Sequence, residues 1–416
     1  MPENQKDIAV IRDLAKRYAE VAADPVQEER RELWRMKNSL ERCRPLIHVR
    51  FGYWNAWAKE VFGEKQLACQ DPFWRGIERS LRILLFHADL ADDTPMEPWL
   101  TVETVHVHHP GGVWGVRHEW ERPDGGGGAA RWDPPIKNLA DDLGRLKRPL
   151  HKIDEAETAR QAARLREAVA GIIAVDVRRN ALLFGWLADI STELAKLRGL
   201  EQIMIDMYED PAGLKRLLAF MRDSVLAVQD AAEQAGDYTI TAHNNQSAPY
   251  SRELEDPKAN SGPRKRRELW CFAAAQEFTL VSPEMHEEFL LAFQKPIIEP
   301  YGLSAYGCCE DLTRKIDMLR QIRNLRRIAV TPVADVAECA RQLGADYVMS
   351  WRPNPTDMFC GNFSEEKVRQ ILRRGLEVSR GCHVEINFKD IENVEGDPGR
   401  IKRCVRVARE EADRAG

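Results

Sequence analysis

The sequence predicts an α/β protein built as a (β/α)8 TIM barrel, with N-terminal helices and an inserted antiparallel β-meander. Strand and helix patterns alternate through the C-terminal half with short connections, which favours parallel strands. The chain has 416 residues, enough for one large barrel. No GxGxxG or GxxxxGK(S/T) motif follows a predicted strand, which disfavours dinucleotide-binding and P-loop folds. We therefore expect residues 1–416 to form a single barrel domain.

The first third of the chain mixes helical and strand patterns. Residues 6–40 carry two amphipathic helical patterns, and we expect residues 1–44 to form a helical cap outside the barrel. Residues 45–51 are predicted as the first strand and residues 73–87 as a helix. The runs within residues 101–132 alternate or are β-branched, and glycine- and proline-containing turns separate them, which is typical of an antiparallel meander.

From residue 150 onwards the alternation of strands and helices becomes regular. The predicted strands are 171–177, 238–242, 303–307, 327–331, 347–350 and 383–388. Helices are expected between them, including 153–170, 211–235, 269–278, 283–301, 333–343 and 364–378. Four consecutive strand–helix units at this chain length favour a closed barrel over an open sheet.

Composition excludes several classes of partner. The net charge is −5, from 61 basic and 66 acidic residues, so the total shows no electrostatic footprint for nucleic acid. Nine cysteines are irregularly spaced, which indicates reduced thiols in a cytoplasm and not a disulfide framework. No apolar run approaches the roughly 18 residues that a membrane span needs. We expect a cytoplasmic protein without nucleic-acid or membrane partners.

The strongest candidate site follows the strand predicted at 303–307. Cys308 and Cys309 are adjacent there, and Glu310 comes next. Because the carboxyl ends of barrel strands form the catalytic mouth, we expect these side chains to lie in it. Two soft thiols and a carboxylate at such a turn could bind a metal or hold a nucleophile. The alternative is that one cysteine is a small buried hydrophobic residue.

Other predicted strand ends bring polar, cationic and aromatic side chains to the same mouth. The residues that we expect there are His243, Lys389 and the substrate-binding candidates Arg50, Tyr53, Trp54, Asn245, Trp351, Arg352 and Asn354. The aromatic rings after the first strand could line a pocket or seal the end of a core. Asn354 precedes a proline, so an ordinary turn is its alternative role.

The pattern of the last strand predicts which of its sides faces inward. Counting by twos from Lys389 gives Asn387 and Glu385, whereas counting from Asp390 gives an apolar set. We expect the apolar set to face the helices, Lys389 to face the mouth and Asp390 to lie at its rim. Cys382 precedes this strand, which places it about 15–20 Å away at the opposite end.

Five segments resemble the uroporphyrinogen decarboxylase-like superfamily and, within it, a bacterial branch of corrinoid-dependent methyltransferases. They are RGLEQIMIDMYEDPAGLKRLLAFM (198–221), QEFTLVSPEMHEEF (276–289), YGCCEDL (306–312), SWRPNP (350–355) and RGCHVEINFKD (380–390). The resemblance covers residues 150–416 well and the first 150 loosely. It implies a TIM barrel whose methyltransferase members hold a zinc ion at the mouth.

In those members a His-x-Cys pair follows one strand and a further cysteine comes later. Here Tyr306 stands in the place of the histidine and Cys308 in that of the cysteine, while Cys382 matches the later cysteine by motif. Zinc is preferred because it accepts mixed sulfur, nitrogen and oxygen ligands. The expected ligands are Cys308, Cys309, Glu310 and His243.

The resemblance implies a methyltransferase that demethylates a small methoxylated or methylated compound and passes the methyl group to the corrinoid of a partner protein. Because an ether or amine is a poor leaving group, such a reaction needs a Lewis acid or a proton donor. The expected catalytic residues are Glu310, Lys389 and His243.

A homodimer is the assembly that we consider. Two alternative functions stay open. One is a decarboxylase or lyase acting on a small carboxylic acid held by Arg50, Arg352 and Lys389. The decarboxylases carry an arginine-rich N-terminal segment, whereas this chain has a single arginine and aromatic residues there, which disfavours a polyacidic tetrapyrrole as substrate. The other alternative is a non-catalytic barrel that binds a corrinoid or tetrapyrrole.

Overall fold

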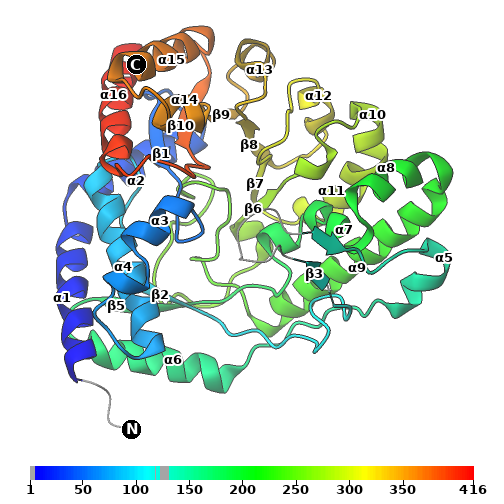
Figure 1. Ribbon diagram of the computed structural model, residues 1–416, viewed down its shortest axis with the longest axis horizontal. Helices are drawn as coiled ribbons and strands as arrows, with labels where there is room; N and C mark the ends of the chain where they lie inside the picture. The colour runs from blue at the N-terminus through cyan, green and yellow to red at the C-terminus, as the bar shows by residue number, and fades with distance from the viewer. Residues whose placement is uncertain (1–4, 118, 122–130) are drawn as a thin grey trace.

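A parallel sheet of six strands is the centre of the computed structural model, which describes residues 5–117, 119–121 and 131–416 (Figure 1). Its spatial order is β1–β10–β9–β8–β7–β6. The strands are β1 (Leu46–Val49), β6 (Trp270–Ala273), β7 (Leu303–Tyr306), β8 (Leu325–Val330), β9 (Val348–Trp351) and β10 (His383–Phe388). The strands predicted at 303–307, 327–331, 347–350 and 383–388 are thus confirmed as parallel neighbours.

Helices cover the outer face of this sheet. In the C-terminal half they are α10 (Pro283–His286), α11 (Ala292–Ile298), α12 (Ile316–Leu319), α13 (Val336–Leu343), α14 (Pro355–Phe359), α15 (Glu365–Val378) and α16 (Gly399–Ala415). In Figure 1, α12, α13, α15 and α16 lie outside the strands. The apolar residues Val384, Ile386 and Phe388 of β10 are buried in the core that these helices share. The polar residues between them therefore face the other side of the sheet.

The N-terminal region forms a helical layer, as the sequence predicts. It contains α1 (Gln5–Ala22), α2 (Val26–Asn38), α3 (Ala56–Val61) and α4 (Pro72–Leu90). Helices α1 and α4 share a separate apolar core that includes Leu14, Trp74 and Leu81. Asp71 caps α4 by accepting hydrogen bonds from the backbone N–H groups of Phe73 and Trp74. No helix of the described residues is long and apolar enough to cross a membrane.

The segment between these two regions departs from the predicted meander. Strand β2 (Trp99–Glu103) pairs in parallel with β5 (Ala174–Arg178), whereas β3 (Glu119–Glu121) and β4 (Arg131–Asp133) pair antiparallel and His106 forms an isolated antiparallel bridge with Ile153. The turn expected at 123–128 lies outside the described residues. Helices α5 (Leu139–Asp142), α6 (Glu155–Ala168), α7 (Ser191–Arg198), α8 (Leu200–Glu209) and α9 (Pro211–Ala235) complete this part. Within the described ranges, no continuous ladder joins β2 and β5 to the six-stranded sheet.

Two element predictions are wrong. Residues 238–242 form a turn, closed by a hydrogen bond from Ala242 N to Thr239 O, and not a strand. Residues 269–278, predicted as a helix, contain β6. All four residues of β6 are buried, so this strand shows no alternation of polar and apolar positions. A short, wholly apolar run fits a buried strand and a helix segment equally well.

Carboxylates satisfy the free edge of β1. Asp93 Oδ2 accepts a hydrogen bond from Ile47 N at 2.7 Å, and Asp92 Oδ2 accepts one from Val49 N at 2.8 Å. Arg44 and Arg409 both pair with Asp93, which neutralises this buried charge. Two loop residues thus replace a neighbouring strand at this edge, where unpaired backbone groups would otherwise be costly.

The inward face of the sheet holds a buried ion pair. Arg327 of β8 contacts Glu385 of β10, and their side chains are 2% and 0% exposed. Asn387 Nδ2 donates to Glu385 Oε1 at 2.9 Å, and Arg327 Nη2 donates to Asn38 Oδ1 at 2.5 Å. The predicted inward orientation of Glu385 and Asn387 is therefore observed, and Arg327 and Asn387 offset the cost of burying the Glu385 charge.

Removing one member of this pair should destabilise the fold strongly. Arg327→Met leaves Glu385 as an uncompensated buried charge, which costs about 3–5 kcal/mol of unfolding free energy. The double variant Arg327→Met with Glu385→Leu should recover part of that loss. Urea unfolding measures both. Arg323→Met, at an exposed ion pair with Glu299, is the control and should change the midpoint little; an equal effect of Arg323→Met and Arg327→Met would contradict the role of the buried pair.

Candidate active site

The candidate site begins where β7 ends, at a glycine that no other residue can replace without strain. Gly307 has φ +100°, and a Cβ there would lie 2.7 Å from Leu312 Cδ1 and 2.9 Å from the Cβ of Ala329. This turn interrupts the strand alternation and brings Cys308 to the inward side. Cys308 there packs with Phe272, Ala274 and Ala305, away from the large core under the helices.

Glu310 shapes the turn that follows. Its Oε2 accepts hydrogen bonds from the backbone N–H groups of both Cys308 (2.7 Å) and Cys309 (2.9 Å). Its Oε1 accepts a third from Ala275 N at 2.7 Å, and the side chain is fully buried. A carboxylate that accepts three N–H bonds is committed to the backbone. The structure therefore gives Glu310 a positioning role for the two cysteines; proton donation or metal binding by it stays a prediction.

Lys389 reaches these thiols from the end of β10. Its Nζ lies 3.0 Å from Cys308 Sγ and 3.6 Å from Cys309 Sγ, and the residue is 5% exposed. Asp390 adds a carboxylate 3.1 Å from the same Nζ, while its own side chain is about half exposed. The inward lysine agrees with the alternation predicted for this strand, whereas Asp390 has a left-handed backbone (φ +56°) that brings its carboxylate to the same side as Lys389. An ammonium group thus lies against a pair of thiols at the carboxyl end of the sheet.

This arrangement shifts the pKa values of the two cysteines in opposite directions. The hydrogen bond from Cys309, together with the charges of Lys389 and Arg352, lowers the pKa of Cys308 from an ordinary value of 9.0 to about 6, against the opposing effect of burial. The same hydrogen bond to Cys308, with burial, raises the pKa of Cys309. Because Lys389 lies closer to Cys308 than to Cys309, Cys308 is the thiol that this arrangement favours as the thiolate.

Two arginines complete the cationic surroundings of Cys308. Arg352 is buried and donates from Nη2 to Gly307 O at 3.2 Å and from Nη1 to Cys308 O, so it holds the turn. Arg50 follows β1 and contacts Gln246 Oε1 through Nη1. Burial and then the like charge of Arg352 lower the pKa of Arg50. The mouth is thus strongly cationic apart from the Cys308 thiolate and Asp390.

Two residues predicted for the mouth have backbone roles elsewhere. His243 Nδ1 accepts a hydrogen bond from the N–H of Trp270, the first residue of β6, whereas the mouth lies at the other end of this strand. Burial lowers the pKa of His243 to about 3. Asn245 is buried and binds Ser247 N and Ala248 O within its own loop. The structure does not bring either residue to Cys308.

Four further substrate-binding candidates also have structural contacts. The Trp351 ring lies over Gly375 of α15, on the helix side of the sheet. Asn354 caps α14 by accepting a hydrogen bond from Thr356 N. Tyr53 lies under the Arg79 guanidinium, 4.1 Å from it, and Trp54 is 64% exposed. Of the seven candidates, the structure brings Arg50 and Arg352 to the surroundings of Cys308.

A zinc ion does not fit the side chains described around Cys308. In the part of the chain that the structure describes, no group of three or more His, Cys, Asp or Glu side chains is placed to hold a metal ion. The Lys389 ammonium lies 3.0 Å from Cys308 Sγ, where its charge would repel a dication bound to the same sulfur. Tyr306, in the place of the family histidine, binds His286 and Gln294 among the helices, and Cys382 precedes β10 at the opposite end.

Two residues near the site were not predicted. Phe272 and Trp186 stack edge-to-face with ring centroids 4.8 Å apart and pack beside Cys308. Phe272 was missed because β6 was predicted as a helix. Gln246, which contacts Arg50, follows the segment predicted as strand 238–242 and has φ +66°. If residues 270–273 had been predicted as a strand, the alternation along it could have placed the Phe272 side chain on the inward face of the sheet.

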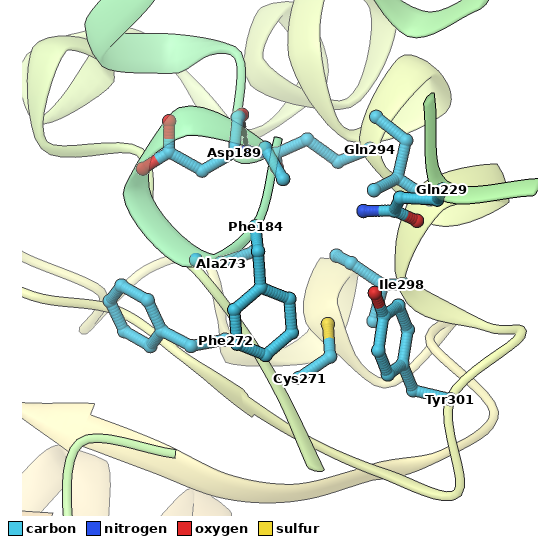
Figure 2. Close-up of a pocket in the computed structure, with 12 residues that line it drawn as sticks. Phe184, Asp189, Gln229, Cys271, Phe272, Ala273, Gln294, Ile298 and Tyr301 are labelled. Atoms are coloured by element: carbon cyan, nitrogen blue, oxygen red, sulfur yellow. Dashed lines mark hydrogen bonds between the residues drawn. The ribbon is translucent and has the colours of Figure 1, made fainter. Parts of the chain in front are cut away.

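A small cavity lies behind β6 and is separate from this site (Figure 2). Its volume of about 10 Å³ leaves room for a single water molecule. Phe184, Asp189, Cys271 and Tyr301 are among its lining residues, whereas Cys308 is not. Burial, reinforced by Glu277, raises the pKa of Asp189 well above its usual range. An organic substrate does not fit there.

Comparison with solved structures shows a fold shared with a methyltransferase from Methanosarcina mazei. The two chains are 12% identical with a TM-score of 0.50, over 92% of this chain and 98% of the other. No family model and no curated protein sequence matches this chain. At this identity the likeness concerns the fold alone.

The pKa of Cys308 gives a direct test of the site. Titrating the ultraviolet absorbance of thiolates in the native protein and in Cys308→Ser should give a difference curve with its midpoint at about pH 6. Because an ammonium group favours the thiolate, Lys389→Met should move this midpoint to higher pH. A midpoint at the ordinary thiol value of 9.0 in the native protein would contradict the thiolate assignment.

Proposed function

We propose that this protein is a methyltransferase that demethylates a small methoxylated or methylated compound and passes the methyl group to the corrinoid of a partner protein. The observation that carries the proposal is the Lys389 ammonium, 3.0 Å from the Cys308 sulfur at the carboxyl ends of parallel strands. The fold shared with a methyltransferase and the sequence resemblance of residues 150–416 support it.

Lys389 supplies the acid that demethylation needs. Cleaving a methyl–oxygen bond places negative charge on the oxygen, and a proton donor at that atom lowers the barrier. Lys389 Nζ donates this proton, and the Cys308 thiolate and Asp390 keep the ammonium in the mouth. Glu310 is committed to three backbone N–H groups, which makes Lys389 the better donor of the two. The corrinoid of the partner would supply the nucleophile that accepts the methyl group.

No step of this mechanism passes through a metal, because the side chains around Cys308 do not fit zinc. The proposed substrates are small methylated or methoxylated compounds, without a narrower class. Arg50 and Phe272 are the residues on this chain best placed to contact it, one through charge and one through its ring. The nine free cysteines favour a reducing, cytoplasmic location.

A second function is favoured by the cationic mouth. Arg50, Arg352 and Lys389 gather around Cys308, and such a cluster also suits a carboxylate substrate. A decarboxylase or lyase acting on a small acid is therefore the alternative. It differs in its product, since carbon dioxide would be released with no methyl group transferred.

The two functions are separated by one assay. The purified protein is incubated with methyl-labelled methoxybenzenes, methoxybenzoates or methylamines and with free reduced cobalamin in place of the partner. The proposal expects the label on the cobalamin, above the rate without protein. Carbon dioxide release from carboxyl-labelled methoxybenzoates, without methyl transfer, would instead establish the alternative.

Lys389 is the residue whose loss should affect turnover most. Lys389→Met should lower methyl transfer by about tenfold or more, because general acid catalysis contributes at least that much. Asp390→Asn should have a smaller effect, since Asp390 acts on the reaction only by pairing with Lys389. Lys402→Met, at an exposed lysine paired with Asp89, is the matched control and should leave turnover unchanged. Full activity in Lys389→Met would show that this residue does not serve as the acid.

A further inference from the structure

The two thiols of Cys308 and Cys309 point to the same side of the chain. Consecutive residues of an extended strand point to opposite sides, so this arrangement requires a bent backbone. Glu310 Oε2 provides the bend by accepting both successive N–H groups, and the two sulfurs lie 3.3 Å apart. A disulfide bond is about 2 Å long, so an approach of about 1 Å would join them.

The two sulfurs differ in access and in their contact with Lys389. Cys309 is exposed, whereas Cys308 is 3% exposed and lies closer to the lysine. An oxidation-sensitive pair typically combines a cysteine beside a cation with a neighbouring thiol that resolves the first product. Cys308 and Cys309 have these two positions, and the methyl-transfer mechanism uses only the first.

We propose that Cys308 and Cys309 form an oxidative modification site, at which a hydroperoxide converts the pair into a disulfide. The Cys308 thiolate attacks the peroxide oxygen, the O–O bond breaks, and the departing oxygen takes a proton to leave as an alcohol or water. The resulting Cys308 sulfenic acid then reacts with the Cys309 thiol, which forms the S–S bond and releases water. The two sulfurs lose two electrons in total, and the peroxide gains them.

Lys389 favours both halves of this reaction. Its ammonium stabilises the Cys308 thiolate before attack and can protonate the departing oxygen. The product removes the thiolate that holds Lys389 in the mouth, so oxidation should also stop methyl transfer until a dithiol reductant restores the pair. The site goes beyond the proposed function, because its formation needs neither a methylated substrate nor a corrinoid.

The test uses the full-length protein, hydrogen peroxide and thiol mapping. After treatment with about one equivalent of peroxide, free thiols are blocked with N-ethylmaleimide and peptides are analysed by mass spectrometry. The proposal expects the peptide with both cysteines to be unlabelled at these positions and two hydrogens lighter, and dithiothreitol to reverse this. In Cys309→Ser the sulfenic acid should persist on Cys308 and react with dimedone.

Matched variants test whether Lys389 is responsible for the oxidation of this cysteine pair. Cys360→Ser, at a half-buried thiol elsewhere in the fold, should leave oxidation of the pair unchanged. Lys389→Met should slow it by about tenfold, whereas Lys389→Arg, which keeps the charge, should retain it. Thiols at 308 and 309 that stay labelled while Cys360 is oxidised would overturn the proposal, and so would an unchanged rate in Lys389→Met. Thiol mapping does not depend on methyl transfer. A failure of the proposed methyltransferase activity can therefore be told apart from a failure of disulfide formation.

Discussion

A single contact, from Lys389 Nζ to Cys308 Sγ at 3.0 Å, joins the carboxyl ends of the two strands that make up the candidate site. It links β7 and β10, which are separated by β8 and β9. The contact exists because Gly307 turns Cys308 inward and because Lys389 continues the inward set of β10. The buried Arg327–Glu385 ion pair joins β8 to β10 within the same sheet. The charged side chains of the mouth are thus followed by a second set of paired charges in the interior.

The contact also decides which chemistry the site favours. A thiol pair at a barrel mouth suits zinc when further ligands surround it, as the sequence resemblance leads one to expect. Here a lysine lies against the sulfurs, Glu310 is committed to the backbone, and His243 lies near the start of β6. The fold is shared with a methyltransferase, whereas the side chains around Cys308 form a thiolate–ammonium pair.

Much of this could be predicted from alternation along single strands. The polar set that ends in Lys389 predicts the inward face of β10, and the strands from β7 to β10 follow from their apolar runs. The same rule separates Trp351 from Arg352, because adjacent residues at a strand end face opposite sides. Strand β6 could not be predicted in this way, since its short apolar run fits a helix segment as well as a strand. The role of Glu310 depends on its hydrogen bonds to Cys308, Cys309 and Ala275, which its place beside two cysteines does not reveal.

The most direct measurement is a crystal structure of the protein grown at neutral pH with zinc, using anomalous scattering to locate the metal. Our account predicts Lys389 Nζ about 3 Å from Cys308 Sγ, as hydrogen bonds to charged groups require, with no anomalous peak between the two thiols. A zinc peak bonded to Cys308, with Lys389 displaced from the sulfur, would contradict it.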